Sequence, residues 1–304
     1  MSLADSSRLS RPRPRAEALL AKLSRVTDRA LDRFLPPATA SPRRLYEAMR
    51  YSVFGGGKRL RPALAILACD ALRGKRGDVL PAAGALEMIH TYSLIHDDLP
   101  AMDDDDFRRG RPSCHKAFDE ATAILAGDGL LTLAFETITT KTNDARLSGP
   151  LARELAIGAG HGGMVGGQQL DLAGSTRTNA AQLRAIHERK TAALLASAVR
   201  LGAIAGHASG AQLSSLTVYG RSLGLAFQIV DDILDVLGTA RQLGKTPGKD
   251  AKQGKATYPA LFGIEESRRR AARLIEEACK SLRFLGPRAA DLEAVARYIV
   301  ERTS

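Results

Sequence analysis

Apolar residues recur along this chain at intervals of three and four positions, which is the spacing of amphipathic helices. No segment alternates apolar and polar residues as a half-buried strand does, and no repeat of roughly 20–50 residues stands out. Glycine and proline gather only in short stretches, so no long linker separates two domains. We therefore predict one all-α domain over 16–304, with helices at 16–34, 41–53, 62–72, 82–99, 120–141, 151–172, 179–206, 211–237, 259–284 and 288–302.

The predicted helix 211–237 is apolar on nearly every side, which is typical of a buried helix, yet it ends in Asp231, Asp232 and Asp235. Asp231 and Asp235 are four residues apart and share a face, whereas Asp232 lies about 100° around the axis. Carboxylates at the C-terminal end of a helix oppose its macrodipole. A solvated last turn is the simpler explanation, but a bound metal ion would remove this conflict.

A second acidic segment contains Asp97, Asp98 and Asp103 and continues to Asp106. Asp103 lies six residues after Asp97, so an unbroken helix would not align the two, but Pro100 ends the helix and lets Asp103 fold back. The run lacks the ligand order of an EF-hand. Because a buried carboxylate without a partner is costly, the two acidic segments indicate one site where several divalent metal ions hold a polyanion.

The predicted helix 82–99 carries a further candidate. Pro81 is expected in its first turn, where the missing N–H is tolerated. His90 lies seven residues before Asp97, two turns along the same face, so we expect it to line the same site. A histidine on an apolar helix is otherwise usually a core residue.

A glycine turn, Gly55–Gly57, precedes a cluster of basic residues. Glycine lets the backbone approach an anion closely, and Lys58 and Arg61 are three residues apart, so both could face one phosphate group. Arg59 stands where a P-loop requires serine or threonine. The alternative is an ordinary basic turn.

Another glycine and lysine segment follows the helix 211–237. Gly238 and Gly244 are separated by five residues and the segment follows a helix rather than a strand, which excludes a Walker A motif. We predict a mobile basic loop over 238–257, in which Lys245 could help to cover a metal-bound anion and exclude water.

The net charge of +11 admits nucleic acid, an anionic membrane surface or an anionic substrate as a partner. Nucleic acid is disfavoured because the chain has no tryptophan and only 5% aromatic residues. No apolar run approaches the length of a transmembrane segment. The three cysteines show no CxxC spacing, so a reducing cytoplasm is the simplest compartment. The basic segment 1–15 lacks the apolar core of a secretory signal and is expected to be a flexible leader.

Five motifs occur in a fixed order along the chain. They are GGGKRLRP (55–62), SLIHDDLPAMDDDDFRRGR (93–111), GQQLDL (167–172), Lys190-Thr191 and FQIVDDILD (227–235). Together they resemble the trans-isoprenyl diphosphate synthase family. The two-residue insertion in the first acidic motif is similar to that of bacterial farnesyl and plant-type geranylgeranyl diphosphate synthases, and the likeness is greatest to the bacterial farnesyl enzymes, the geranyltranstransferases.

The resemblance implies a bundle of about ten or more mostly antiparallel helices around a deep central cleft, usually in a homodimer. It implies the condensation of isopentenyl diphosphate with dimethylallyl and geranyl diphosphate to farnesyl diphosphate, by ionisation, condensation and elimination. It also implies three Mg²⁺ ions, for which Mn²⁺ can substitute. The residues that it assigns to these ions are Asp97, Asp98, Asp103, Asp231, Asp232 and Asp235.

The two diphosphates would be bound differently. The allylic diphosphate leaves, so it needs Lewis acids against its developing charge, whereas the other must stay and receives only point charges. The oxygen dipoles of Thr191 and Gln228 would stabilise the allylic cation. The residues that the motifs assign are Arg108, Lys190 and Lys245 to the allylic diphosphate, and Lys58, Arg61, His90 and Arg109 to isopentenyl diphosphate.

Product length is expected to depend on the helix 82–99. Ser93 and Tyr92 lie about 6–7.5 Å before Asp97 along a helix. In the family, an aromatic residue at the position of Tyr92 is associated with stopping at farnesyl diphosphate, with Ser93 leaving room above it. The alternative is that Tyr92 is a core aromatic residue, in which case its hydroxyl should have a hydrogen-bond partner.

Other functions remain open at this point. Within the family, the product could be geranylgeranyl diphosphate. A class I terpene cyclase would share the helical fold, but its second metal motif usually mixes Asn, Ser and Glu. A non-catalytic subunit typically lacks one acidic motif, and this chain has both. A helical nucleic-acid-binding protein would be recognised if DNA or RNA competed with diphosphates.

Overall fold

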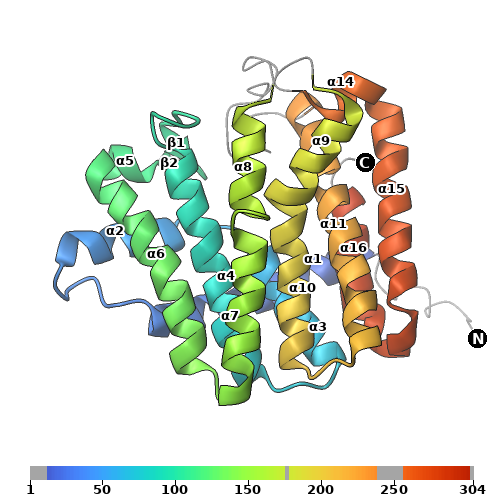
Figure 1. Cartoon of the computed structure of the whole chain (residues 1–304), viewed down its shortest axis with the longest axis horizontal. Helices are drawn as coiled ribbons and strands as arrows, with labels where there is room; N and C mark the ends of the chain where they lie inside the picture. Colours follow the sequence, from blue (N-terminus) through green and yellow to red (C-terminus); the bar gives the residue numbers. More distant parts are fainter. Residues whose placement is uncertain (1–11, 175–177, 238–255, 302–304) are drawn as a thin grey trace, which may run out of the picture.

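The computed structural model describes residues 12–174, 178–237 and 256–301, almost all of them helical (Figure 1). The all-α prediction is confirmed. Among these residues the strands are limited to a small antiparallel hairpin. The elements are α1 (Pro12–Phe34), α2 (Arg43–Val53), α3 (Leu60–Ala71), α4 (Arg76–Asp97), β1 (Phe107–Arg108), β2 (Arg111–Pro112), α5 (Cys114–Ala117), α6 (Glu120–Lys141), α7 (Ala145–Ala159), α8 (Met164–Leu172), α9 (Ala180–His187), η1 (Glu188–Ala192), α10 (Ala193–Ala205), α11 (Gly210–Leu237), α14 (Tyr258–Phe262), α15 (Ile264–Ser281), η2 (Arg283–Ala289) and α16 (Ala290–Glu301).

Several predicted boundaries are wrong. α1 begins at Pro12, inside the predicted leader, and α4 begins before Pro81, which lies inside the helix rather than in its first turn. The predicted helix 151–172 is two helices, α7 and α8, separated at Gly160–Gly163. The predicted helix 259–284 is interrupted at Gly263, whose φ of 75° is a conformation that favours glycine.

The predicted helix 179–206 contains a feature that the sequence did not indicate. Its middle turn, η1, is π-helical and carries Lys190 and Thr191, two of the predicted site residues. A π-turn adds one residue to a helical turn and frequently marks a functional site.

The helices share one hydrophobic core, in which α4 packs against α3, α6 and α10, and α11 packs against α10 and α15. Leu86, Met88 and Ile89 of α4 are fully buried. Figure 1 shows that α4 and α11 run in the same direction, so their C-terminal ends lie at the same end of the bundle. These ends carry the two acidic motifs.

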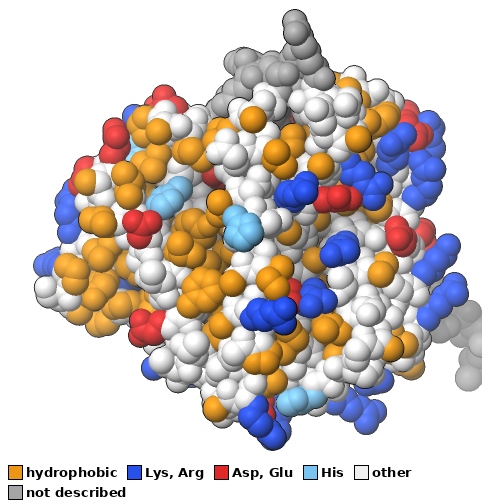
Figure 2. Space-filling model, in the orientation of Figure 1, with side chains coloured by type: hydrophobic (Ala, Val, Ile, Leu, Met, Phe, Trp, Pro, Cys, Tyr) orange, Lys and Arg blue, Asp and Glu red, His pale blue; other side chains and the backbone are white. Residues whose placement is uncertain are grey.

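Among the described helices, α6 has a length and an apolar composition that would allow it to cross a membrane. This qualifies the expectation that no such run exists, but α6 packs along α2, α4 and α7, as a core helix does, so it is weak evidence for a membrane span. The exposed fractions of Ile124 and Leu125 are 44% and 58%, and hydrophobic side chains gather on this side of the molecule in Figure 2.

Candidate active site

The first acidic motif folds back on itself after α4. The backbone N–H of Asp103 donates to the carbonyl of Asp97 at 2.8 Å, and that of Asp105 donates to the carbonyl of Asp98 at 3.1 Å. The chain turns at Asp104, which has a positive φ of 48°. The predicted return of Asp103 towards Asp97 is thus present, and the turn begins at Asp98, directly after α4, and includes Pro100.

Asp98 is buried and paired with Arg108 of the β1–β2 hairpin. The Nε of Arg108 lies 2.9 and 3.3 Å from the two carboxylate oxygens of Asp98, and its Nη2 donates to Asp98 and, at 3.4 Å, to Asp105. Burial raises the pKa of Asp98 and the hydrogen bond with Arg108 opposes this. In this structure Asp98 therefore orients Arg108, whereas the motif assigned Asp98 to metal ions and Arg108 to the allylic diphosphate.

Asp97 has the carboxylate best suited to a divalent cation. It is half-buried and, within the described residues, makes no side-chain hydrogen bond or ion pair. Burial raises its pKa to about 6, and the nearby charge of Asp103 adds to this, while Lys190 and Arg108 oppose it. Clustered carboxylate oxygens are hard ligands, so Asp97 and Asp103 fit Mg²⁺ and Mn²⁺.

Lys190 of η1 is positioned by α8. Its Nζ donates to Asp171 of α8 at 2.5 Å. A Cβ added at Gly167 would lie 2.1 Å from the backbone nitrogen of Lys190, so only glycine allows α8 and η1 to approach this closely. Glycine at position 167 of the GQQLDL motif thus brings Lys190 within electrostatic reach of Asp97.

Thr191 connects η1 to the second acidic motif on α11. Its hydroxyl donates to Oε1 of Gln228 at 2.7 Å, and Nε2 of Gln228 donates to Asp232 at 3.1 Å. The other oxygen of the buried Asp232 accepts from the backbone N–H of Tyr258 at 3.0 Å. The structure thus gives Gln228 and Asp232 protein partners, while the motif assigned them to the allylic cation and to metal ions.

Asp231 and Asp235 share one face of α11, as predicted, because the helix is continuous through both. Asp235 is buried and Asp231 is half-buried. Asp231 lies within electrostatic reach of Arg61 on α3. α11 therefore links both groups of predicted residues, since its Gln228 bonds Thr191 and its Asp231 interacts with Arg61.

The glycine turn is fixed by Arg59, for which the sequence suggested no role. Arg59 has a left-handed φ of 49°, and its guanidinium is buried. It forms ion pairs with Asp28 at 2.8 Å and with the buried Glu87 at 2.7 Å. This anchor leaves Lys58 exposed, 3.4 Å from the hydroxyl of Tyr298.

Arg61 and Arg109 form a positive cluster beside this turn, and His90 lies close to both. Arg109 donates to the carbonyl of Gly56, and a Cβ at Gly57, whose φ is 123°, would lie 2.7 Å from the Arg109 guanidinium. Burial lowers the pKa of all three side chains, and mutual repulsion of the guanidiniums contributes. The Nε of Arg61 is buried with no hydrogen-bond partner among the described residues. An anion would relieve both penalties, so the cluster fits a diphosphate.

Tyr92 and Ser93 lie on α4 between His90 and Asp97. Tyr92 is buried, and burial with the charge of Asp97 raises its pKa to about 12. Its ring packs edge-on against His96 at 5.7 Å between centroids, and its hydroxyl makes no hydrogen bond with the described residues. Ser93 donates to the carbonyl of His90 at 2.9 Å. The hydroxyl is not among the buried polar atoms that lack a partner, so a core tyrosine would need no protein partner here. The role of Tyr92 at the site stays a prediction.

Two residues of the GQQLDL motif, Gln168 and Asp171, belong to the candidate site although they were not predicted as site residues. Asp171 holds Lys190, and both polar atoms of the Gln168 amide are buried without a hydrogen-bond partner in the described residues. The motif itself was the available signal, but its spacing alone gives no role to single residues. The predicted loop residue Lys245 lies outside the described residues.

The chain matches the family model described as polyprenyl synthetase over residues 42–286. It is 48% identical to farnesyl diphosphate synthase of Escherichia coli over 286 residues, which cover 90% of this chain and 95% of that protein. It is 49% identical to a chloroplastic geranylgeranyl pyrophosphate synthase of Catharanthus roseus over 267 residues, covering 86% and 74%. A crystal structure of an FPP/GFPP synthase from Zymomonas mobilis superposes with a TM-score of 0.82 and 39% identity, covering 94% of this chain and 98% of that one. Fold, site and comparisons agree that the chain belongs to the polyprenyl synthetase family and has the all-α fold of the isoprenyl synthases.

Proposed function

We propose that this prenyltransferase condenses isopentenyl diphosphate with dimethylallyl and then geranyl diphosphate to give farnesyl diphosphate. The observation that carries the proposal is the pairing of two sites of opposite charge: Asp97 with Asp103 on one side, and the cluster of Arg61 and Arg109 on the other. Relatives are named for both farnesyl and geranylgeranyl products, so geranylgeranyl diphosphate is the second candidate product.

Asp97, Asp103 and Asp231 would hold Mg²⁺ ions, three in all as the motifs imply, with Asp235 in support. Bound there, the ions would neutralise the diphosphate that leaves the allylic substrate. Asp98 and Asp232 contribute mainly by holding Arg108 and Gln228 in place. Lys190, anchored by Asp171, adds a positive charge for the same diphosphate.

The second diphosphate would lie against the glycine turn. Arg61 and Arg109 offer guanidinium donors there, and burial keeps His90 neutral, so its ring can accept or donate one hydrogen bond. The hydroxyl oxygen of Thr191 would stabilise the allylic carbocation, because its lone pairs remain available after the hydroxyl donates its hydrogen to Gln228.

Incubation with isopentenyl and dimethylallyl diphosphates and Mg²⁺, followed by product identification, tests the function. Farnesyl diphosphate is expected as the main product. If the main product is geranylgeranyl diphosphate, the assigned product is wrong and the second candidate replaces it. A cyclic hydrocarbon made from an allylic diphosphate alone would indicate a terpene cyclase. The absence of any condensation would contradict the proposal.

The separation of the two diphosphate sites can be tested by steady-state kinetics. Lys58→Ala and Arg61→Ala should raise the KM for isopentenyl diphosphate by roughly tenfold to a hundredfold, because each removes a charged hydrogen bond to that ligand. Lys245→Ala should act mainly on the KM for the allylic substrate. Equal effects of all three substitutions on both substrates would show that this division is wrong.

Product length provides the test of Tyr92. Tyr92→Ala should move the main product from farnesyl towards geranylgeranyl diphosphate or longer, because it removes the ring below Ser93. Tyr92→Phe is the matched control, since it keeps the ring and should keep the product. Chromatography of the dephosphorylated products measures the shift, and an unchanged distribution in Tyr92→Ala would exclude Tyr92 from this role.

We also propose a homodimer in a reducing cytoplasm. The exposed apolar side chains Ile124 and Leu125 on α6 support an interface with a second copy, since exposed apolar patches commonly mark such contacts. The three cysteines are free and buried, which suits a reducing compartment. Competition by DNA or RNA against diphosphates is not expected.

A further inference from the structure

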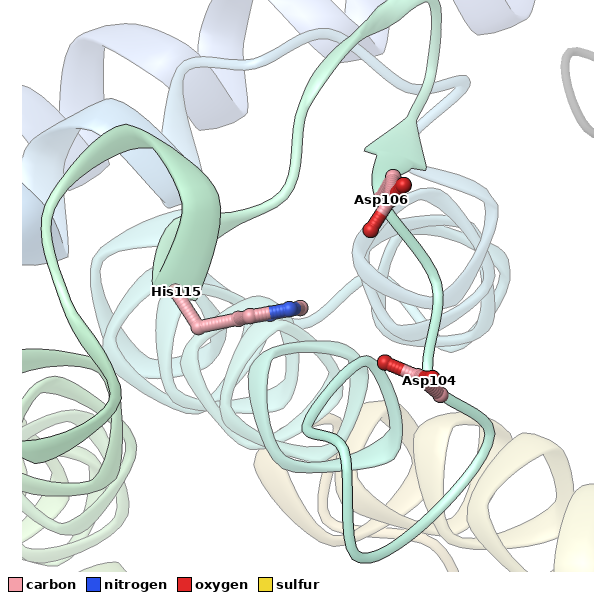
Figure 3. A group of neighbouring side chains, drawn as sticks. All are labelled: Asp104, Asp106 and His115. Carbon is pink, nitrogen blue, oxygen red and sulfur yellow. The ribbon is translucent and has the colours of Figure 1, made fainter.

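Three side chains outside the proposed catalytic carboxylates also have the chemistry of a metal site. Asp104 and Asp106 lie in the loop between α4 and β1, and His115 lies in α5. One ligand atom from each residue lies within 4.8 Å of the other two. Figure 3 shows the His115 ring directed towards both carboxylates.

His115 provides the observation that indicates a ligand. Its side chain is only 7% exposed, and its Nε2 is buried with no hydrogen-bond partner in the part of the chain that the structure describes. Nδ1 lies 3.1 Å from the hydroxyl oxygen of Ser113. If Nδ1 donates its proton to Ser113, the lone pair of Nε2 faces the carboxylates, and such a hydrogen bond commonly fixes the tautomer of a metal-binding histidine.

We propose that Asp104, Asp106 and His115 bind one divalent transition-metal ion of the Zn²⁺ class. One imidazole nitrogen with two carboxylates suits Zn²⁺, Co²⁺ or Mn²⁺ better than Mg²⁺. Bonds of about 2.0–2.2 Å place two ligands of one ion roughly 3–4 Å apart, so a small rotation of the two exposed aspartates completes the site. Water would supply the remaining ligands.

Lys116 competes with the ion. Its Nζ lies 2.9 Å from Oδ1 of Asp106, and both side chains are largely exposed. Binding of a divalent cation exchanges this solvent-screened ion pair for a metal bond. Removal of Lys116 should therefore strengthen metal binding, while removal of a ligand should weaken it. General attraction to acidic residues would give the same two effects, so the distinguishing control is Glu120, a nearby acid that is not a ligand.

The location gives the ion a role in positioning. The loop that holds Asp104 and Asp106 also carries Asp103 and leads into Arg108, and His115 lies within electrostatic reach of Asp98. An ion bound here would join this loop to α5. It would thereby hold the loop of the first acidic motif without touching the substrate.

The test is a titration of the full chain with Zn²⁺ in the absence of any diphosphate, followed by calorimetry and by NMR of ¹⁵N-labelled imidazoles. One equivalent should bind and shift the Nε2 resonance that is missing from His115→Gln. Asp104→Asn and Asp106→Asn should weaken binding by at least the roughly tenfold to hundredfold that loss of an outer-shell partner costs. Lys116→Gln should tighten it, and Glu120→Gln, which neutralises a nearby exposed acid, should leave it unchanged.

A Zn²⁺-dependent shift of the His115 Nε2 resonance that persists in the double variant Asp104→Asn/Asp106→Asn, or a shift of another histidine instead, would overturn the proposal. Loss of the Zn²⁺ signal in Asp97→Asn would also overturn it, because the ion would then belong to the catalytic carboxylates. The readout requires no turnover, so its failure leaves the proposed prenyltransferase reaction unaffected.

Discussion

Asp97→Asn and Asp231→Asn should each lower kcat by at least about a thousandfold. A bound metal ion supplies several kcal/mol of charge stabilisation at a leaving group, and each 1.36 kcal/mol is about a factor of ten in rate. Rapid-quench kinetics at saturating Mg²⁺ measures the loss. Asp128→Asn, at an exposed carboxylate on α6, is the matched control and should be near wild type. Near-normal turnover in either site variant, or in excess chelator, would refute the metal assignment.

Measurement of stability shows whether Asp97→Asn still folds, because this variant should lose activity yet be more stable than the wild type without metal. The pKa of Asp97 is raised from 3.8 to about 6, so the native state binds more protons than the unfolded state between these values. Ionised Asp97 therefore destabilises the metal-free protein as pH rises through this window, and the penalty is complete above it. In chelator at pH 8, the free energy of unfolding of Asp97→Asn should exceed that of the wild type by about 1–2 kcal/mol, after allowance for the partial exposure of Asp97. This difference should vanish below pH 4.

Arg59→Leu should destabilise the protein by about 3–5 kcal/mol, because it leaves the carboxylate of Glu87 buried without a partner. The substitution also removes the hydrogen bond to the carbonyl of Val53 at 2.7 Å and the ion pair with Asp28. Urea unfolding followed by circular dichroism measures the change. A loss below about 1 kcal/mol would show that this ion pair contributes little.

Two further variants separate this effect from the loss of a surface charge. Lys58→Ala, at the adjacent exposed position, should change the free energy of unfolding by no more than about 0.5 kcal/mol. The double variant Arg59→Leu/Glu87→Leu should recover part of the loss, since it removes the buried unpaired charge.

Helix positions were predictable wherever apolar periodicity decides them. α6 begins and ends at the predicted residues, and α2 ends at Val53, as predicted. Periodicity does not reveal that three glycines near position 160 separate two helices, or that Pro81 can lie inside α4, because tertiary packing decides both.

The candidate site was predictable to the level of motifs but not of single contacts. Spacing and Pro100 predicted the return of Asp103 towards Asp97, because a proline-induced turn is a local effect. The pairing of Asp98 with Arg108 depends on the hairpin Phe107–Pro112, whose short strands give no sequence pattern. The role of Arg59 depends on Glu87, a residue of another helix, and no local signal reports such a partner.

The π-turn Glu188–Ala192 rotates α9 about the helix axis relative to α10, which follows it without a break in the chain. Deleting a single residue there would restore regular α-helical winding and rotate α9 by about 100° relative to α10. Leu183 and Ile186 would then turn out of the core, or Lys190 and Thr191 would turn away from Asp171 and Gln228. The added residue thus lets Leu183 and Ile186 face the core while Lys190 and Thr191 reach Asp171 and Gln228, a combination that regular α-helical geometry would not allow.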